Sequence, residues 1–184
     1  MINIEYEITE QEYKDFCLYT GWLSPDKKNR WIKYYATNLL IYIGLSFFIH
    51  LISKNLLFTI PGIIIHIIIG ALFFIYLRSS IKSNYYKHVK NAIEESGEGK
   101  ILTLANLHFN ESGILEKTNS SEVKYNWSAI IKKTEVHNCY YLYTTSLHAL
   151  IVPKRVFVTI DEKERFERTL LQYIPLQVAF KNIV

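Results

Sequence analysis

The sequence has little of the chemistry on which enzymes and metal sites are built. Its two cysteines, Cys17 and Cys139, form no CxxC pair, so neither a disulfide framework nor a thiolate metal site is indicated. HExxH, GxSxG, P-loop and GxGxxG motifs are absent, and no two of the six histidines stand at ligand spacing with a cysteine or carboxylate between them. We therefore expect a protein that is not an enzyme and that has no catalytic residue, no metal ion and no cofactor.

Charged residues are also missing from two long runs of the chain. Residues 34–52 and 56–77 contain no Lys, Arg, Asp or Glu, although the mean hydropathy of the whole chain is only +0.06. The second run would form a helix about 33 Å long, which is enough to cross a hydrocarbon core about 30 Å thick. Only residues 53–55 separate the runs, so we expect a transmembrane helical hairpin over residues 31–77, with spans at about 31–52 and 56–77.

Basic residues flank the outer ends of the two runs, against Lys54 alone in the turn. Because Lys and Arg gather on the cytoplasmic side of membrane proteins, this pattern places both termini in the cytoplasm and the two spans in a bacterial inner membrane. Anionic headgroups would then account for the net charge of +4, so membrane lipid is an expected partner and nucleic acid is not. The flanking residues are Lys27, Lys28, Arg30, Lys33, Arg78, Lys82, Lys87 and Lys90.

The residues outside the spans divide into three segments. Residues 1–30 begin with an alternating strand pattern at 2–8, followed by a helix that the capping box of Thr9 and Glu12 opens. Residues 78–95 continue the second span as a basic juxtamembrane helix, and the two glycines of ESGEGK at 95–100 mark a domain boundary. Residues 96–184 form the third segment, a cytoplasmic domain.

This last segment has strand patterning. Residues 101–109, 113–118, 123–136, 138–145 and 148–157 each predict a strand, and NESG at 110–113 predicts a turn. A second capping box, Thr159 with Glu162, opens a helix that stops at Pro175 and carries the apolar stripe Phe166, Leu170, Tyr173 and Ile174. A bent antiparallel sheet closed by one C-terminal helix is the architecture of a pleckstrin-homology-like domain. The expected fold class is therefore an α+β membrane protein, a two-helix hairpin plus this β domain.

Several short motifs are also distinctive: EYEITEQEY near the start, WSAI at 127–130, YLY at 141–143 and ALIVPKRVF at 149–157. Together with the two spans, they resemble the YcxB-like family of bacterial membrane proteins over nearly the whole chain. The resemblance implies a two-span anchor with a cytoplasmic pleckstrin-homology-like domain. It implies no catalytic residue, and Val156 departs from the smaller residue expected before the aromatic.

One ionisable residue, His66, lies near the middle of the second run. In a hairpin that turns about Lys54, residues at equal depth have numbers that sum to about 108, so Tyr42 lies opposite His66. Two stripes with four-residue spacing then face each other, which predicts a polar interface inside the membrane. The first stripe is Asn38, Tyr42 and Ser46, extended by His50, and the second is Gly62, His66 and Gly70.

The role of His66 has three interpretations. The first is a neutral histidine that bonds the Tyr42 hydroxyl and fixes the register of the helices. The second is a proton relay, which the lack of any carboxylate in either span disfavours. The third is the docking of a partner helix on the stripe.

Two pairs of adjacent bases, Lys132–Lys133 and Lys154–Arg155, are candidates for an anionic-lipid pocket or a partner contact. The competing interpretation is that they are solvated loop and strand-end residues. Residues 140–143 carry large side chains on both faces of one strand, so that strand is either central or covered by a second surface. A partner and the chain's own N-terminal segment would both supply such a surface.

These observations support two functional hypotheses. In the first, a non-enzymatic inner-membrane protein presents a cytoplasmic interaction module to an unidentified protein partner. In the second, the chain is an immunity protein that neutralises a membrane-acting bacterial toxin, because a small polytopic protein with a polar intramembrane stripe suits that role. A homo-oligomer is compatible with both.

Overall fold

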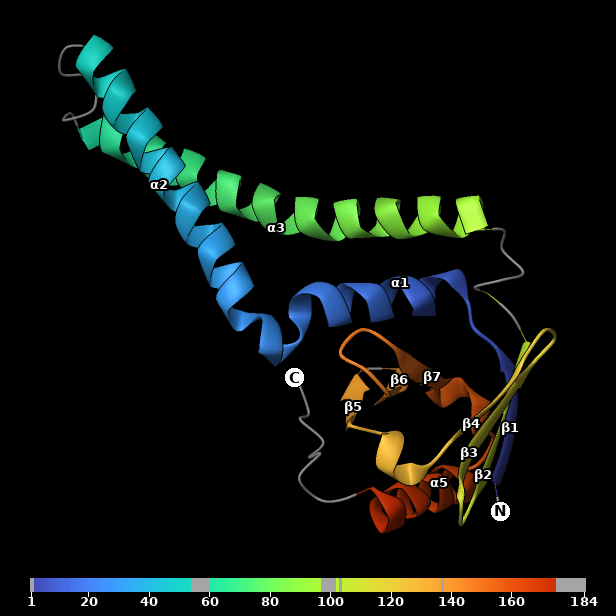
Figure 1. The fold of residues 1–184 in the computed structure, drawn as a ribbon. Helices are drawn as coiled ribbons and strands as arrows, with labels where there is room; N and C mark the ends of the chain where they lie inside the picture. Colours follow the sequence, from blue (N-terminus) through green and yellow to red (C-terminus); the bar gives the residue numbers. More distant parts are fainter. Residues whose placement is uncertain (1, 54–59, 97–101, 103, 137, 175–184) are drawn as a thin grey trace. The chain divides into compact units, whose positions relative to one another are not determined.

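The computed structural model describes all residues except 1, 54–59, 97–101, 103, 137 and 175–184 (Figure 1). The chain forms two compact units, one from residues 1–20 and 89–184 and the other from residues 21–88. The predicted turn between the helices and most of the predicted boundary at 95–100 lie outside the described residues.

The unit of residues 21–88 is built on two long helices. After the short turns η1 (Tyr19–Leu23) and η2 (Pro25–Lys27), α2 runs over Lys28–Ser53 and α3 over Ile60–Ser96. Both helices are long and apolar enough to cross a membrane. Their apolar side chains are mostly exposed, whereas the core helix of a soluble protein would bury them. α3 continues past residue 78 without a break, so the basic segment belongs to the same helix as the second apolar run.

The other unit contains two antiparallel sheets and two helices (Figure 1). The first sheet has the order β1-β2-β3-β4, and the second has the order β5-β6-β7. The helix α1 (Glu10–Leu18) follows β1, and α5 (Ile160–Tyr173) follows the last strand. The strands are β1 (Ile2–Glu7), β2 (Leu104–Asn110), β3 (Gly113–Thr118), β4 (Glu122–Tyr125), β5 (Lys132–Val136), β6 (Cys139–Tyr143) and β7 (Ala149–Pro153).

The N-terminal strand pairs with the strand that follows the two long helices. β1 is antiparallel to β2 along its full length, from Ile2 opposite Phe109 to Glu7 opposite Leu104. The alternation of residues 2–8 predicts this strand, and its inward side chains Ile4 and Tyr6 are buried. The helices α1, α2 and α3 are thus all inserted between two neighbouring strands of one sheet.

Several of the predicted strands are shorter than expected. Residues 123–136 do not form one strand, because β4 ends at Tyr125 and the 3₁₀ turn η4 (Trp127–Ala129) leads into β5 of the second sheet. The buried indole of Trp127 donates from Nε1 to the carbonyl of Asn110 at 2.9 Å, which holds the chain at this crossing. Likewise β7 ends at Pro153, and residues 154–156 form the 3₁₀ turn η5.

The main core lies among the inner faces of the two sheets and one face of α5. The ring of Phe166 on α5 lies 5.3 Å from that of Phe109 on β2 and 5.2 Å from that of Tyr140 on β6. The predicted capping box at Thr159 and Glu162 is confirmed, and the predicted stripe faces the core, with Phe166 and Leu170 fully buried. Burial of this stripe is what attaches α5 to the sheets.

A second cluster lies on the other face of β5–β7, where α1 covers it. Phe16 of α1 packs edge-on against Tyr141 at 5.2 Å, and the hydroxyls of Thr20 and Tyr143 lie 2.8 Å apart. All five residues of β6 are buried, because this strand is central in its sheet and covered on both faces. The covering surface is therefore the chain's own N-terminal segment, and the predicted capping box that opens α1 at Thr9 and Glu12 is confirmed.

The turn between β2 and β3 depends on a glycine. The side-chain carbonyl of Asn110 accepts bonds from the backbone N–H groups of Ser112 and Gly113, at 2.9 and 3.1 Å. Gly113 has φ of +145°, and a Cβ there would lie 2.1 Å from the carbonyl oxygen of Tyr125. Only glycine fits this position without displacing β4.

Candidate functional site

The predicted polar interface of the hairpin lies where α2 and α3 contact each other. The hydroxyl of Tyr42 donates to the backbone carbonyl of His66 at 2.6 Å. On the same helices the rings of Tyr42 and Phe73 stack at 5.8 Å, and those of Tyr35 and Phe74 lie 6.4 Å apart. Tyr42 therefore meets the residue that the depth rule places opposite it.

The imidazole of His66 has a different partner from the one we expected. Its Nδ1 lies 3.1 Å from the carbonyl oxygen of Gly62, one turn earlier in α3. The predicted bond between the ring and the Tyr42 hydroxyl is wrong, because the ring bonds its own helix and the hydroxyl bonds the backbone. The contact between the helices thus uses the carbonyl that every residue type at position 66 would offer.

The other residues of the two stripes are placed as follows. The side-chain amide of Asn38 donates to the carbonyl of Tyr34 at 2.8 Å, within α2, and Ser46 is half-buried. Gly70 lies beside Tyr42, because the three atoms nearest to a Cβ built at Gly70 all belong to the Tyr42 side chain, the closest being its hydroxyl oxygen at 3.2 Å. The side chain of His50 is outside the described residues.

The Lys154–Arg155 pair lies in an ion-pair network at the end of β7. Lys154 forms a salt bridge with Glu135 and lies over the ring of Tyr140. Arg155 binds both carboxylate oxygens of Glu12, at 2.8 and 3.0 Å, and also donates to the carbonyl of Glu7. Both bases are thus engaged by groups of the same chain.

The Lys132–Lys133 pair lies at the other end of the same sheet. Lys132 pairs with Tyr143, whose other neighbour is Ala149, the first residue of β7. Lys132, Tyr143 and Ala149 therefore lie side by side across the sheet. Lys154 comes five positions after Ala149, or about 16 Å further along the chain direction. Lys133 is only 2 % exposed, and burial lowers its pKa. The structure therefore does not bring the four bases together into one pocket.

Glu12 has a role that the sequence did not reveal. Its carboxylate accepts from the backbone N–H of Thr9 at 2.9 Å, which caps α1, and it also binds Arg155. Burial raises the pKa of Glu12, but hydrogen bonds from Arg155 and Thr9 outweigh burial, and the pKa lies below its ordinary value of 4.5. The capping-box pattern predicts the first role, whereas nothing local predicts a partner 143 positions away.

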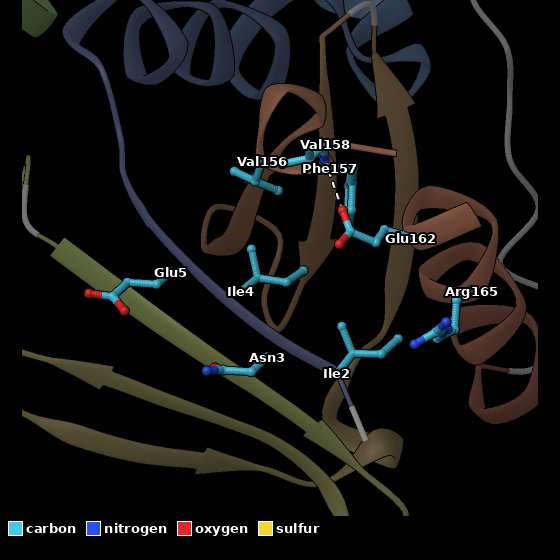
Figure 2. Close-up of a pocket in the computed structure, with 9 residues that line it drawn as sticks. All are labelled: Ile2, Asn3, Ile4, Glu5, Val156, Phe157, Val158, Glu162 and Arg165. Atoms are coloured by element: carbon cyan, nitrogen blue, oxygen red, sulfur yellow. Dashed lines mark hydrogen bonds between the residues drawn. The ribbon is translucent and has the colours of Figure 1, made fainter. Parts of the chain in front are cut away.

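A pocket of about 240 Å³ opens beside the free edge of β1 (Figure 2). The carboxylate of Glu162 accepts from the backbone N–H of Val158 at 2.9 Å and so belongs to the cap of α5. Arg165 extends toward Ile2. The nine lining residues are Ile2, Asn3, Ile4, Glu5, Val156, Phe157, Val158, Glu162 and Arg165.

Burial moves the pKa of two groups of the β unit away from neutral pH. Burial, followed by the nearby carboxylates of Glu12 and Asp15, raises the pKa of the Cys139 thiol to about 12. Burial also raises the pKa of Tyr125 to about 12, with Glu116 adding to the shift. Over the described part of the chain, no group of three or more His, Cys, Asp and Glu residues is placed to hold a metal ion.

Comparison with protein families gives a match between residues 109–170 and the family model described as YcxB-like protein. The matched segment runs from the end of β2 into α5, and it includes Trp127 and the ALIVPKRVF motif. The resemblance to this family is confirmed over that segment. Neither the curated proteins nor the solved structures contain a match to the chain.

Proposed function

We propose that this protein is a non-enzymatic protein of the bacterial inner membrane, anchored by a hairpin of α2 and α3, which presents a pleckstrin-homology-like module to a protein partner in the cytoplasm. The observation that carries the proposal is the pairing of β1 with β2. These strands flank the two long helices, and strands of one sheet must lie on the same side of a membrane. The chain must therefore cross the membrane an even number of times between β1 and β2, and a two-span hairpin does so.

The orientation rests on charge. Arg30 and Lys33 near the start of α2, and Arg78 and Lys82 on α3, lie at the end of the hairpin from which the β unit continues. Basic residues at one end of a span favour the cytoplasm for that end. The module therefore belongs in the cytoplasm, together with both ends of the chain described here.

The architecture of the β unit supports the module that the resemblance implies. Seven strands in two antiparallel sheets are closed by the amphipathic helix α5, and Trp127 stacks on Tyr173 of that helix at 4.9 Å. On this unit Val158 and Ile160 are 89 and 77 % exposed, and Val158 lines the β1 pocket. Exposed apolar groups beside a sheet edge are typical of a surface that binds another chain.

Labelling of introduced cysteines tests the topology. Asn55→Cys, between the helices, should react with a membrane-impermeant maleimide in intact spheroplasts, whereas Ser120→Cys should react only after lysis. The unsubstituted chain, with Cys17 and Cys139, measures the background. Labelling of Ser120→Cys in intact spheroplasts, or release of the chain by alkaline carbonate, would contradict the proposal.

Photo-crosslinking tests the module. A photoreactive amino acid at Val158 or Ile160 of the full chain should yield an adduct with a discrete protein, whereas the same group at Lys117, which pairs with Glu122 on the first sheet, should not. Adducts of equal yield from all three positions, or none from Val158 and Ile160, would count against this surface.

Immunity to a membrane-acting toxin is the alternative function. It would use the polar groups of the hairpin, yet Tyr42, His66 and Asn38 each have a partner within the hairpin. We therefore place the partner on the cytoplasmic module. Protection of cells against such a toxin that is lost on Asn38→Leu would favour the alternative.

A further inference from the structure

The start of α2 carries basic groups, among them Arg30 and Lys33. Asn29, Arg30, Ile32 and Lys33 line a shallow groove on this helix. In the described part of the chain, the ion pairs involve neither Arg30 nor Lys33, whereas Lys154 and Arg155 are both paired with glutamates. A groove that offers two positively charged side chains is complementary to an anion.

Arg30 is held in place by the backbone. Its Nη1 donates to the carbonyl of Gly21 at 3.0 Å, and Gly21 in turn lies against the ring of Tyr85 on α3. A side chain at Gly21 would meet that ring at 2.7 Å, so glycine allows this close approach. One nitrogen of the guanidinium is thus fixed, and its remaining N–H groups are left to bind a ligand with less loss of side-chain freedom.

Aromatic rings define the depth of the groove. Trp22 packs edge-on against Tyr34 at 5.3 Å, and Trp31 lies 6.4 Å from Tyr35. Rings of this kind concentrate at the headgroup level of a membrane, because they are apolar with a polar edge. Arg30 comes five positions, or one to two turns, before Tyr35, whose ring lies 6.4 Å from that of Phe74 on α3.

We propose that this groove binds the phosphate of an anionic phospholipid. Arg30 donates to the phosphate oxygens as a fork, Lys33 adds a point charge, and the amide of Asn29 donates a further hydrogen bond. Ile32 lies in the same groove against the apolar part of the lipid. A zwitterionic lipid fits less well because its cationic group would be repelled by Lys28, Arg30 and Lys33. The site rests on the proposed insertion of the hairpin.

The test uses the full chain in phosphatidylcholine vesicles that contain a small fraction of brominated lipid, which quenches nearby tryptophans. Trp22 and Trp31 lie near the start of α2, as the groove does, and Trp127, buried in the β unit, provides a constant background. From the quenching, the relative binding constant of brominated phosphatidylglycerol should be at least about five-fold above that of brominated phosphatidylcholine. Arg30→Gln with Lys33→Gln should bring this ratio close to one, and the control Lys117→Gln should leave it unchanged.

Each other outcome overturns a defined part of the proposal. Equal quenching by the two lipids, or a preference that survives the double substitution, overturns the lipid site alone. Quenching by neither lipid overturns the insertion of the hairpin and with it the site. A preference abolished by inorganic phosphate, but not by chloride of the same ionic strength, identifies a free-phosphate site and overturns the assignment to lipid.

Discussion

The hydroxyl of Tyr42 on α2 donates to the backbone carbonyl of His66 on α3, while the imidazole of His66 bonds the carbonyl of Gly62 within its own helix. The two polar groups of this contact are thus a tyrosine side chain and a main-chain oxygen. In the bilayer that we propose as its setting, this carbonyl has no water to bind, so a second donor to it favours one register of the two helices.

Tyr42→Phe should therefore destabilise the hairpin more than His66→Leu. Loss of the hydroxyl removes the bond between the helices, at a cost of about 1 kcal/mol. His66→Leu keeps the acceptor carbonyl and should change the free energy of unfolding by less than that. Unfolding of the full chain in dodecylmaltoside by added SDS, followed by tryptophan fluorescence, measures both, and a larger loss for His66→Leu would contradict this assignment.

Gly70 should not accept a larger residue while Tyr42 is present. A Cβ at Gly70 would lie 3.2 Å from the Tyr42 hydroxyl oxygen, so Gly70→Ala should be about 1 kcal/mol less favourable than Gly44→Ala in the same assay. The matched control is Gly44→Ala on α2, where a Cβ meets nothing within 4 Å and helix propensity favours alanine. If the hydroxyl is the obstacle, the cost of Gly70→Ala should shrink in the Tyr42→Phe background.

The ion pair between Glu12 and Arg155 should make the β unit sensitive to acid. Hydrogen bonds from Arg155 and Thr9 outweigh burial and keep the pKa of Glu12 below 4.5 in the folded chain, so the unfolded chain binds a proton first as the pH falls. The stabilisation is complete above pH 4.5 and is lost as the pH falls through the folded pKa. Glu12→Gln should lower the Tm at pH 7 and flatten its decrease between pH 5 and pH 3; a parallel decrease in both chains would exclude Glu12 as a source.

Tyr6 should stabilise the β unit although it precedes both long helices in the chain. It is 6 % exposed, and its hydroxyl donates from β1 in the first sheet to the carbonyl of Ile151 in the second. Tyr6→Ala should cost about 3–5 kcal/mol and Tyr6→Phe about 1 kcal/mol. Hydrogen exchange at the amides of β2 and β7 measures this, with the exposed Asn3→Ala as a control that should leave exchange unchanged.

Local patterns predicted much of this structure. The structure contains both capping boxes, the turn at Gly113 and the apolar stripe of α5. Each of these features depends on residues that are close together in the sequence. The contact of Tyr42 with His66 follows from a short connection between two long helices, because that connection leaves little freedom in register.

Distant partners and side-chain directions were not predictable in this way. The alternation of residues 2–8 indicates a strand but not its partner, which lies beyond both helices. The bond between Arg155 and Glu12 joins two segments that are distant in the sequence. For the imidazole of His66, the sequence pattern allowed both the Tyr42 hydroxyl and the Gly62 carbonyl as partners, and the structure has the carbonyl. The crossing from the first sheet to the second at Trp127 was not predicted. Apolar and polar residues alternate through this position as they do in a strand, although the backbone forms a 3₁₀ turn there.

The pairing of β1 with β2 also sets an order of events during synthesis. Leu104 follows its partner Glu7 by 97 positions, which a ribosome adds in roughly 5–20 s. Throughout that interval β1 has no neighbouring strand, and the apolar helices emerge first. A nascent chain therefore completes its first sheet only after the hairpin has been made, and a ribosome stalled within α3 would leave the edge of β1 open to proteases.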